Sequence, residues 1–141
     1  MNALVLCVGK LKEDWQREAC REYLKRLGRY GRFGMTEVDD CPEPAKPAPA
    51  LKKQVLDREA EALLRQIKPA DRVVALAIDG DAPDSVGLSR KLSAWAGDGR
   101  RVVFVIGGSL GLSDSILRRA DERLSFSRLT FPHTLMRVIL A

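Results

Sequence analysis

A glycine-rich turn is the first part of this sequence with a clear chemical use. Gly107 and Gly108 follow an uninterrupted apolar run and precede Ser113, a residue type suited to begin a helix. Glycines in such a turn let a ligand approach the backbone closely, and the amides of the turn can then hydrogen-bond that ligand. The alternative is a tight connection between a strand and a helix. The pattern is neither GxGxxG nor GxxxxGKS/T, so nothing in it requires a pyrophosphate or ATP.

His133 is the only histidine of the chain, and it follows Pro132 at the place where a last helix is expected to begin. A helix N-terminus favours the neutral imidazole, which can accept a proton from a substrate. His133 is therefore a candidate general base. The alternative is a histidine that caps the helix or lies at the edge of the core, and the residue alone leaves both interpretations open.

Carboxylates and thiols give weaker signals. Asp79, Asp81 and Asp84 could form turns or contact a ligand, and we favour turns. The cysteines are odd in number and lack CxxC spacing, and the chain has only one histidine that could join them as a metal ligand. This composition argues against a disulfide framework and against a zinc site. They are Cys7, Cys20 and Cys41. We expect reduced thiols, with Cys7 in the core, and no bound metal.

Alternating strands and helices must position these residues. Strands are predicted from continuous apolar runs, and helices from apolar residues three or four positions apart. The expected strands are 3–8, 35–38, 72–78 and 102–106. The expected helices run from Asp14 to a stop at Gly28, over 51–67, from a cap at Asp84 or Ser85, from a cap at Ser113, and from Pro132. Four prolines in residues 41–50 predict a stiff, exposed loop.

This order of elements predicts the fold class and the place of the site. Strands that lack polar alternation and that alternate with helices are typical of an α/β fold, a mostly parallel sheet with helices on both faces. Ligands of such sheets bind outside the carboxyl ends of the strands. The turns after Ile78, Ile106 and Phe131 are therefore the candidate sites.

Length and composition set limits on the class of protein. The 141 residues, of which 45% are hydrophobic, fit a single domain spanning 1–141. No apolar run approaches the ~20 residues of a membrane span, which excludes a membrane protein. The first residues lack the basic segment of a signal peptide. We expect a soluble, cytoplasmic protein.

The net charge of +5 is unevenly placed. Residues 10–32 carry eight Lys or Arg against four acids, and residues 100–141 carry seven Arg against three acids, so the rest of the chain sums to −3. Basic ends around an acidic middle favour an anionic partner such as RNA, although a solvated surface is an equally good reading of charge alone. The candidate RNA-binding residues are Arg17, Arg21, Arg100, Arg101 and Arg137.

Two segments carry a resemblance to a known family. They are Ile106-Gly107-Gly108-Ser109-Leu110-Gly111-Leu112 and the stretch from Leu124 through Ser125-Phe126-Ser127-Arg128-Leu129-Thr130-Phe131-Pro132-His133 to Ala141. The sequence resembles the RlmH family, SPOUT-class methyltransferases that methylate N3 of a pseudouridine in large-subunit (23S) ribosomal RNA on the assembled ribosome. The likeness covers essentially the whole chain.

The resemblance implies a C-terminal trefoil knot, a homodimer, and S-adenosylmethionine bound in the knot. It implies that His133 faces the substrate. The cofactor-binding residues that it implies are Leu76, Ile106, Gly107, Gly108, Phe126, Ser127, Arg128, Leu129, Thr130 and Phe131.

The chain departs from the family pattern at three places. The usual L-D-x-x-G is Leu76-Ala77-Ile78-Asp79-Gly80, and Leu110 replaces the usual acidic residue of the glycine turn. Such enzymes usually continue past Ala141 with Tyr, His and Arg residues that complete the partner's active site. The last helix is apolar on most sides, so either the chain is truncated or a partner subunit covers that surface.

The alternatives are a non-catalytic module that binds S-adenosylmethionine or RNA, and a flavodoxin-like nucleotide binder. The flavodoxin-like reading leaves the segment 127–133 unexplained.

Overall fold

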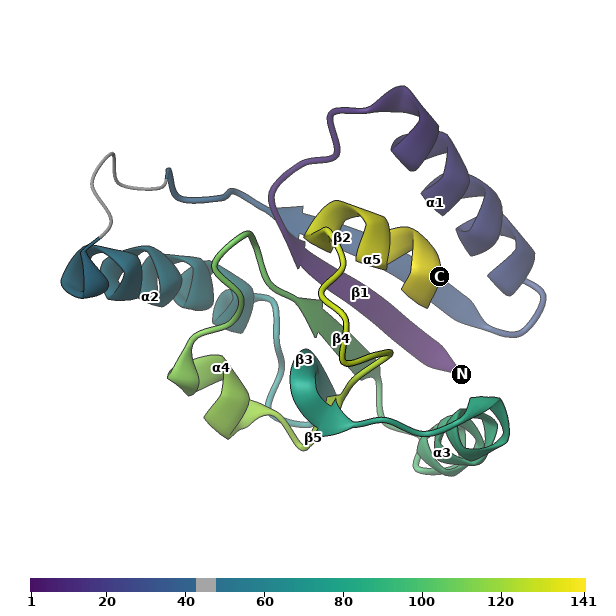
Figure 1. The fold of residues 1–141 in the computed structure, drawn as a ribbon. Coiled ribbons are helices and arrows are strands. Elements are labelled where there is room, and N and C mark those ends of the chain that lie inside the picture. The colour runs from purple at the N-terminus through teal and green to yellow at the C-terminus, as the bar shows by residue number, and fades with distance from the viewer. Residues whose placement is uncertain (43–47) are drawn as a thin grey trace.

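A computed structural model describes residues 1–42 and 48–141 of the chain. Within this part, five strands form one parallel sheet in the order β2-β1-β4-β3-β5 (Figure 1). The strands are β1 (Asn2–Val8), β2 (Arg32–Val38), β3 (Arg72–Asp81), β4 (Val102–Ile106) and β5 (Glu122–Leu124). The helices are α1 (Asp14–Leu27), α2 (Pro49–Arg65), α3 (Ser85–Gly97), α4 (Asp114–Arg119) and α5 (His133–Leu140). The α/β class and the parallel sheet are confirmed.

Helices cover both faces of the sheet, as continuous apolar strands require. Alternate residues of β1 point to opposite faces, so Leu6 and Val8 join the core under α2 and α4. Cys7 lies on the other face, where α5 packs (Figure 1). Burial raises the pKa of the Cys7 thiol to about 12, so this cysteine is an inert core residue, as predicted.

The order of the strands separates this fold from the flavodoxin type. A flavodoxin-like sheet has the order β2-β1-β3-β4-β5, in which β3 lies beside β1. Here β4 lies between β1 and β3, and each pairing is parallel. The flavodoxin-like alternative is therefore wrong.

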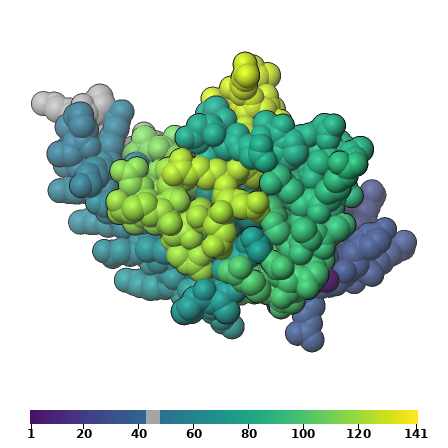
Figure 2. Space-filling model, turned by 90° about the horizontal axis from the view of Figure 1, so that it is seen from below, coloured from purple at the N-terminus to yellow at the C-terminus, as the bar shows by residue number. Residues whose placement is uncertain are grey.

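The region after Ile78 differs from the expected turn. β3 continues through Asp79 and Gly80 to Asp81, with a register irregularity, and pairs with β5, a short strand that the mixed sequence did not predict. A Cβ at Gly80 would lie 2.8 Å from the backbone of Arg123, so only glycine lets the two strands approach this closely. The chain from β5 onward lies between α4 and α3 (Figure 2), where Arg123 is exposed and Leu124 and Ser125 are buried.

The ends of several helices follow the expected signals. Asp84 accepts a hydrogen bond from the Gly87 amide at 2.7 Å and caps α3, and Ser113 caps α4. α2 begins at Pro49, two residues before the expected start, because proline fits the first turn of a helix. Residues 43–47 of the expected proline-rich loop lie outside the described residues.

One face of α1 is not buried as its apolar spacing predicts. Trp15 and Tyr23 are exposed, whereas Gln16 and Cys20 face the interior. α1 packs beside α5 (Figure 1), and the contact between them includes Gln16, whose side-chain amide donates a hydrogen bond to the Thr134 hydroxyl.

Candidate active site

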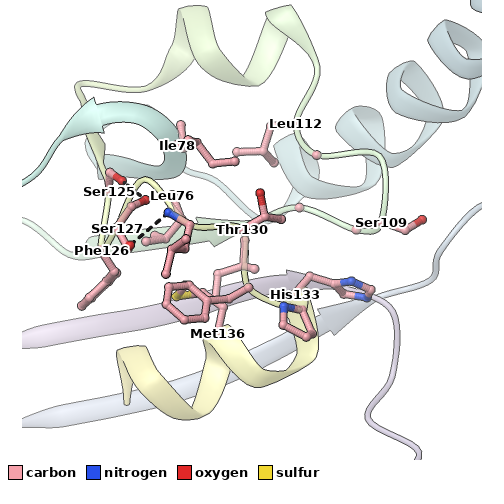
Figure 3. A pocket seen from close by; sticks show the side chains of 18 of the residues that line it. Leu76, Ile78, Ser109, Leu112, Ser125, Phe126, Ser127, Thr130, His133 and Met136 are labelled. Atoms are coloured by element: carbon pink, nitrogen blue, oxygen red, sulfur yellow. Dashed lines mark hydrogen bonds between the residues drawn. The ribbon is translucent and has the colours of Figure 1, made fainter.

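Three chain segments meet in a cleft of about 700 Å³ at the carboxyl ends of β3 and β4. They are residues 76–78 within β3, the glycine turn after Ile106, and the segment between β5 and α5. The segments lie far apart in the sequence, and a parallel sheet brings them to one edge because its strands all point the same way. Two of the three expected turns, those after Ile106 and Phe131, thus meet in one site, to which β3 contributes residues 76–78 and not a turn after Ile78 (Figure 3).

The lining of this cleft is apolar and uncharged. Figure 3 shows Ile78 and Leu112 on one side of the cleft and Phe126 and Met136 on the other. Leu129 also lines the cleft and is largely exposed. None of the described residues that line the cleft is Lys, Arg, Asp or Glu. Such a surface suits an aromatic or aliphatic ligand that carries no phosphate.

A local hydrogen-bond pattern fixes the segment that follows β5. The Ser125 hydroxyl donates to the Ser127 carbonyl at 2.9 Å, and the Leu129 amide donates to the Ser127 hydroxyl at 3.0 Å (Figure 3). The Ser125 amide also donates to the Asp81 carbonyl, which ties the segment to β3. Two serine side chains therefore shape the backbone that forms this wall of the cleft.

The glycine turn is closed on itself. The Gly111 amide donates to the Gly108 carbonyl at 3.0 Å, and Gly111 has a φ of 85°, in the left-handed region that favours glycine. A Cβ on Gly107 would lie 2.3 Å from the Gly111 carbonyl oxygen. Gly107 is therefore required by the turn itself, and the same turn forms part of the cleft.

His133 begins α5 and lines the cleft on the same side as Ser109 (Figure 3). Burial lowers the pKa of this imidazole below its ordinary value, and the positive charge of Arg137 lowers it further. Asp40 has a smaller, opposite effect. His133 is therefore neutral at physiological pH and able to accept a proton.

Arg137 is buried, so the prediction that it contacts RNA is wrong. It is 0% exposed, and its guanidinium donates to Glu37 Oε2 at 2.7 Å and to the carbonyls of Val8 and Gly9 at 2.8 and 2.7 Å. This side chain holds α5 against the ends of β1 and β2. Arg137 is a structural residue, because its one strong charge is already neutralised inside the protein.

Arg100 and Arg101 also lie away from the cleft. They precede β4, so the five steps to Ile106 separate Arg101 from the cleft by about 16 Å. The Asp71 carboxylate accepts from Arg101 at 2.6 Å, and Arg100 donates to the carbonyls of Ala70 and Asp71. These arginines close the opposite end of the sheet.

The arginines of α1 remain on the surface. Arg17 pairs with Asp14 and donates to the Leu11 carbonyl, and Arg21 is exposed. The expectation that both contact RNA stays a prediction.

Most of the residues expected to bind a cofactor line the cleft, and several others were missed. Arg128 alone of the expected set is not in the lining. The residues that sequence reasoning missed are Ala77, Ile78, Ser109, Leu110, Gly111, Leu112, Leu124, Ser125, Pro132 and Met136. All of them except Met136 lie within four residues of an expected position, and Met136 could have been found because it lies one helical turn after His133.

Within residues 1–42 and 48–141, no group of three or more His, Cys, Asp or Glu side chains is placed to hold a metal ion. No helix in the same part of the chain is long and apolar enough to cross a bilayer.

Comparison with known proteins decides the family. The family described as "Predicted SPOUT methyltransferase" matches residues 1–141. The chain belongs to the SPOUT methyltransferase family. The resemblance to RlmH proteins is likewise confirmed by relatives named "Ribosomal RNA large subunit methyltransferase H".

Three of these SPOUT relatives illustrate the degree of similarity. The protein of Listeria monocytogenes is 46% identical, that of Bifidobacterium animalis subsp. lactis 45%, and that of Bacillus pumilus 44%. Each match extends over 141 residues and covers 99% of this chain and 89% of the relative. The cleft is therefore the candidate active site of a methyltransferase.

Proposed function

We propose that this methyltransferase uses S-adenosylmethionine to methylate N3 of a pseudouridine in 23S ribosomal RNA of the assembled large subunit. One observation carries the proposal. Three segments that the RlmH resemblance assigns to the cofactor meet in one uncharged cleft, with a neutral histidine at its edge. Relatives of which the match covers 89% are named as ribosomal RNA large subunit methyltransferases.

The cleft fits this cofactor better than it fits a nucleotide phosphate. S-adenosylmethionine carries no phosphate, and the described lining offers no lysine or arginine to neutralise one. The apolar side chains of Leu76, Phe126 and Leu129 can enclose an adenine ring, while the backbone of the turn after Ile106 offers polar groups for the rest of the molecule.

The chemistry then divides between the cofactor and the protein. When bound, S-adenosylmethionine supplies a methyl group activated by a sulfonium sulfur. The fixed walls of the cleft orient the reactants and exclude water, which lowers the barrier of a displacement reaction. His133, held neutral by burial and by Arg137, accepts the proton that leaves the base nitrogen.

Two further proposals concern the path of the chain and its location in the cell. After β5, at one edge of the sheet, the chain crosses to α5, which packs on β4 near the middle. We propose that this crossing forms the trefoil knot. We also place the protein in the cytoplasm, where ribosomes are found.

A homodimer is proposed from the exposed large apolar side chains of two helices in contact, α1 and α5. Trp15 is 55% exposed and Ile139 is 41% exposed, and Tyr23 lies two helical turns after Trp15 on the same side of α1. An apolar patch of this kind usually marks an interface. A second copy of the chain is the occupant that the family resemblance implies.

Calorimetric titration with S-adenosylmethionine tests the cofactor site. Ile78 lines the cleft and is 57% exposed, so Ile78→Arg should abolish binding without unfolding the protein. Val86→Arg is the control, since Val86 is 59% exposed on α3 and lies outside the lining. Failure of the parent protein to bind would refute the cofactor assignment.

Methyl transfer tests the reaction itself. Labelled cofactor and whole ribosomes containing unmethylated pseudouridine should give labelled large-subunit RNA, and His133→Ala should slow the transfer by about 10² or more. Binding of the cofactor without any transfer would favour the non-catalytic alternative.

A further inference from the structure

A second cavity of about 380 Å³ lies beside the first. The two cavities share Gly108, Ser109 and His133, so they are neighbours across the glycine turn and the start of α5. Apart from Val8 at the end of β1 and Thr134 of α5, the rest of the second lining comes from the loop after β1, from α1, from the segment after β2 and from α2. None of the latter elements contributes to the first cleft.

The second cavity has the opposite chemical character. Its buried interior includes Gln16 and Glu59, and the Gln16 side-chain amide donates to the Thr134 hydroxyl at 3.2 Å. Its exposed rim includes two ammonium groups, those of Lys10 and Lys12. The first cleft has no charged side chain among its described lining, whereas the second combines carboxylates, an amide, a hydroxyl and lysines.

This pairing fits the two reactants of a methyl transfer. The accepting nitrogen must come within about 3–3.5 Å of the methyl carbon, so the substrate base has to reach the place where the two cavities meet. His133 lines both cavities and therefore stands at that place. A base that entered from the second cavity would present its N–H group to the neutral imidazole.

We propose that the second cavity receives the methyl-accepting nucleotide, with a uracil-type base in the polar interior and an adjoining phosphate on Lys10 and Lys12. Amide, hydroxyl and carboxylate groups can pair with the N–H and carbonyl groups of such a base. A base inside a duplex cannot enter a cavity of this kind, so the nucleotide is single-stranded or turned out of its stack. This inference rests on the proposed function.

Charge reversal at the rim tests the phosphate contacts. The double variant Lys10→Glu, Lys12→Glu should raise KM for whole ribosomes by about tenfold or more. The slope of the logarithm of the binding constant against the logarithm of the salt concentration should become less steep by about 1.4, the amount expected for two lost phosphate contacts to a single strand. The affinity for S-adenosylmethionine should stay within about twofold, because neither lysine lines the first cleft.

The control is Lys52→Glu with Lys53→Glu. These two exposed lysines of α2 line neither cavity, and their reversal changes the net charge by the same amount. Equal effects of the two double variants would show that only the overall charge matters and would overturn the proposal.

A thiol probe tests occupancy of the interior independently of activity. Cys41 lines the second cavity and is partly exposed, whereas Cys7 and Cys20 are buried. Methyl methanethiosulfonate should modify Cys41, and bound ribosomes should protect it, as followed by mass spectrometry of the peptide. S-adenosylmethionine alone should not protect it. Modification should block methyl transfer, and Cys41→Ala should resist this block.

The outcomes separate this inference from the proposed function. If the parent transfers methyl groups but ribosomes leave Cys41 unprotected, the nucleotide does not enter this cavity and the inference fails alone. If no transfer occurs, protection of Cys41 by ribosomes would still support RNA in the cavity, and the absence of protection would overturn it. Protection by S-adenosylmethionine alone would assign the cavity to the cofactor instead.

Discussion

Replacing Arg137 by methionine should strongly destabilise the protein. Methionine is apolar and similar in length, so the change removes the guanidinium while it fills much of the space. The carbonyls of Val8 and Gly9 then lose their side-chain donor, and Glu37 loses its cation. Removing one partner of a buried ion pair costs about 3–5 kcal/mol, and unsatisfied buried carbonyls cost about 1–3 kcal/mol each.

The expected loss is about 4 kcal/mol in the free energy of unfolding. Glu37 keeps the hydrogen bond from the Leu11 amide at 2.8 Å and is partly exposed to water, so the full sum of these costs is not reached. For a domain of this size, about 3 °C of Tm corresponds to 1 kcal/mol, which gives a shift of about 12 °C. Urea and thermal unfolding at one fixed protein concentration measure both quantities.

Arg21→Met is the matched control. Arg21 is exposed on α1, and its replacement should change the free energy of unfolding by less than about 0.5 kcal/mol. The salt dependence of RNA binding should be unchanged in Arg137→Met at a temperature at which it is folded. A loss below about 1 kcal/mol, or a reduced salt slope, would refute the structural role assigned to Arg137.

Three further predictions concern the turn, the histidine and the dimer. Gly107→Ala should weaken cofactor binding by about tenfold, because the new Cβ would lie 2.3 Å from a backbone oxygen. Gly97→Ala is the control, since its Cβ would meet nothing within 4 Å, and it should leave the affinity measured by calorimetry unchanged. The pKa of His133, followed by NMR of its imidazole resonance, should lie below the ordinary value of 6.5. The imidazole is then neutral at every pH above this lowered pKa and becomes protonated as the pH falls through it. A titration midpoint above pH 6.5 would contradict the effect of burial. Trp15→Glu with Ile139→Glu should give a monomer in light scattering, and an unchanged mass would exclude this face as the interface.

Periodicity and apolar runs predicted the layers of the fold, because a strand that is buried on both faces has a continuous apolar sequence. Apart from the exposed Asn2 at the start of β1, β1 and β4 contain only residues that a two-sided core accepts, and their expected bounds agree with the structure within one residue. The end of β3 did not follow this rule. Asp79-Gly80-Asp81 has the composition of a turn, but pairing with β5 and ion pairs of Asp79 with Arg123 and Asp81 with Lys91 keep it extended.

Charge composition located the basic segments but not their roles. Arg101 and Arg137 are equally basic in sequence, yet each is held by a carboxylate from a distant element, Asp71 or Glu37. Only the folded chain shows such partners. Ligands of parallel sheets bind at the carboxyl ends of the strands, and this rule also applies to β1. Applied to β1, it would have indicated Lys10, which lies just after the end of that strand.

The short helix α5 links the two cavities to the stability of the sheet. A helix of eight residues is marginal on its own, so contacts must fix its position. Arg137 supplies one such contact at the ends of β1 and β2, while Met136 faces the first cleft and Thr134 the second. His133, one helical turn before Arg137, lines both. Because these residues share one rigid element, a change that loosens Arg137 must displace a wall of each cavity together with the candidate base, although Arg137 itself lines neither cavity.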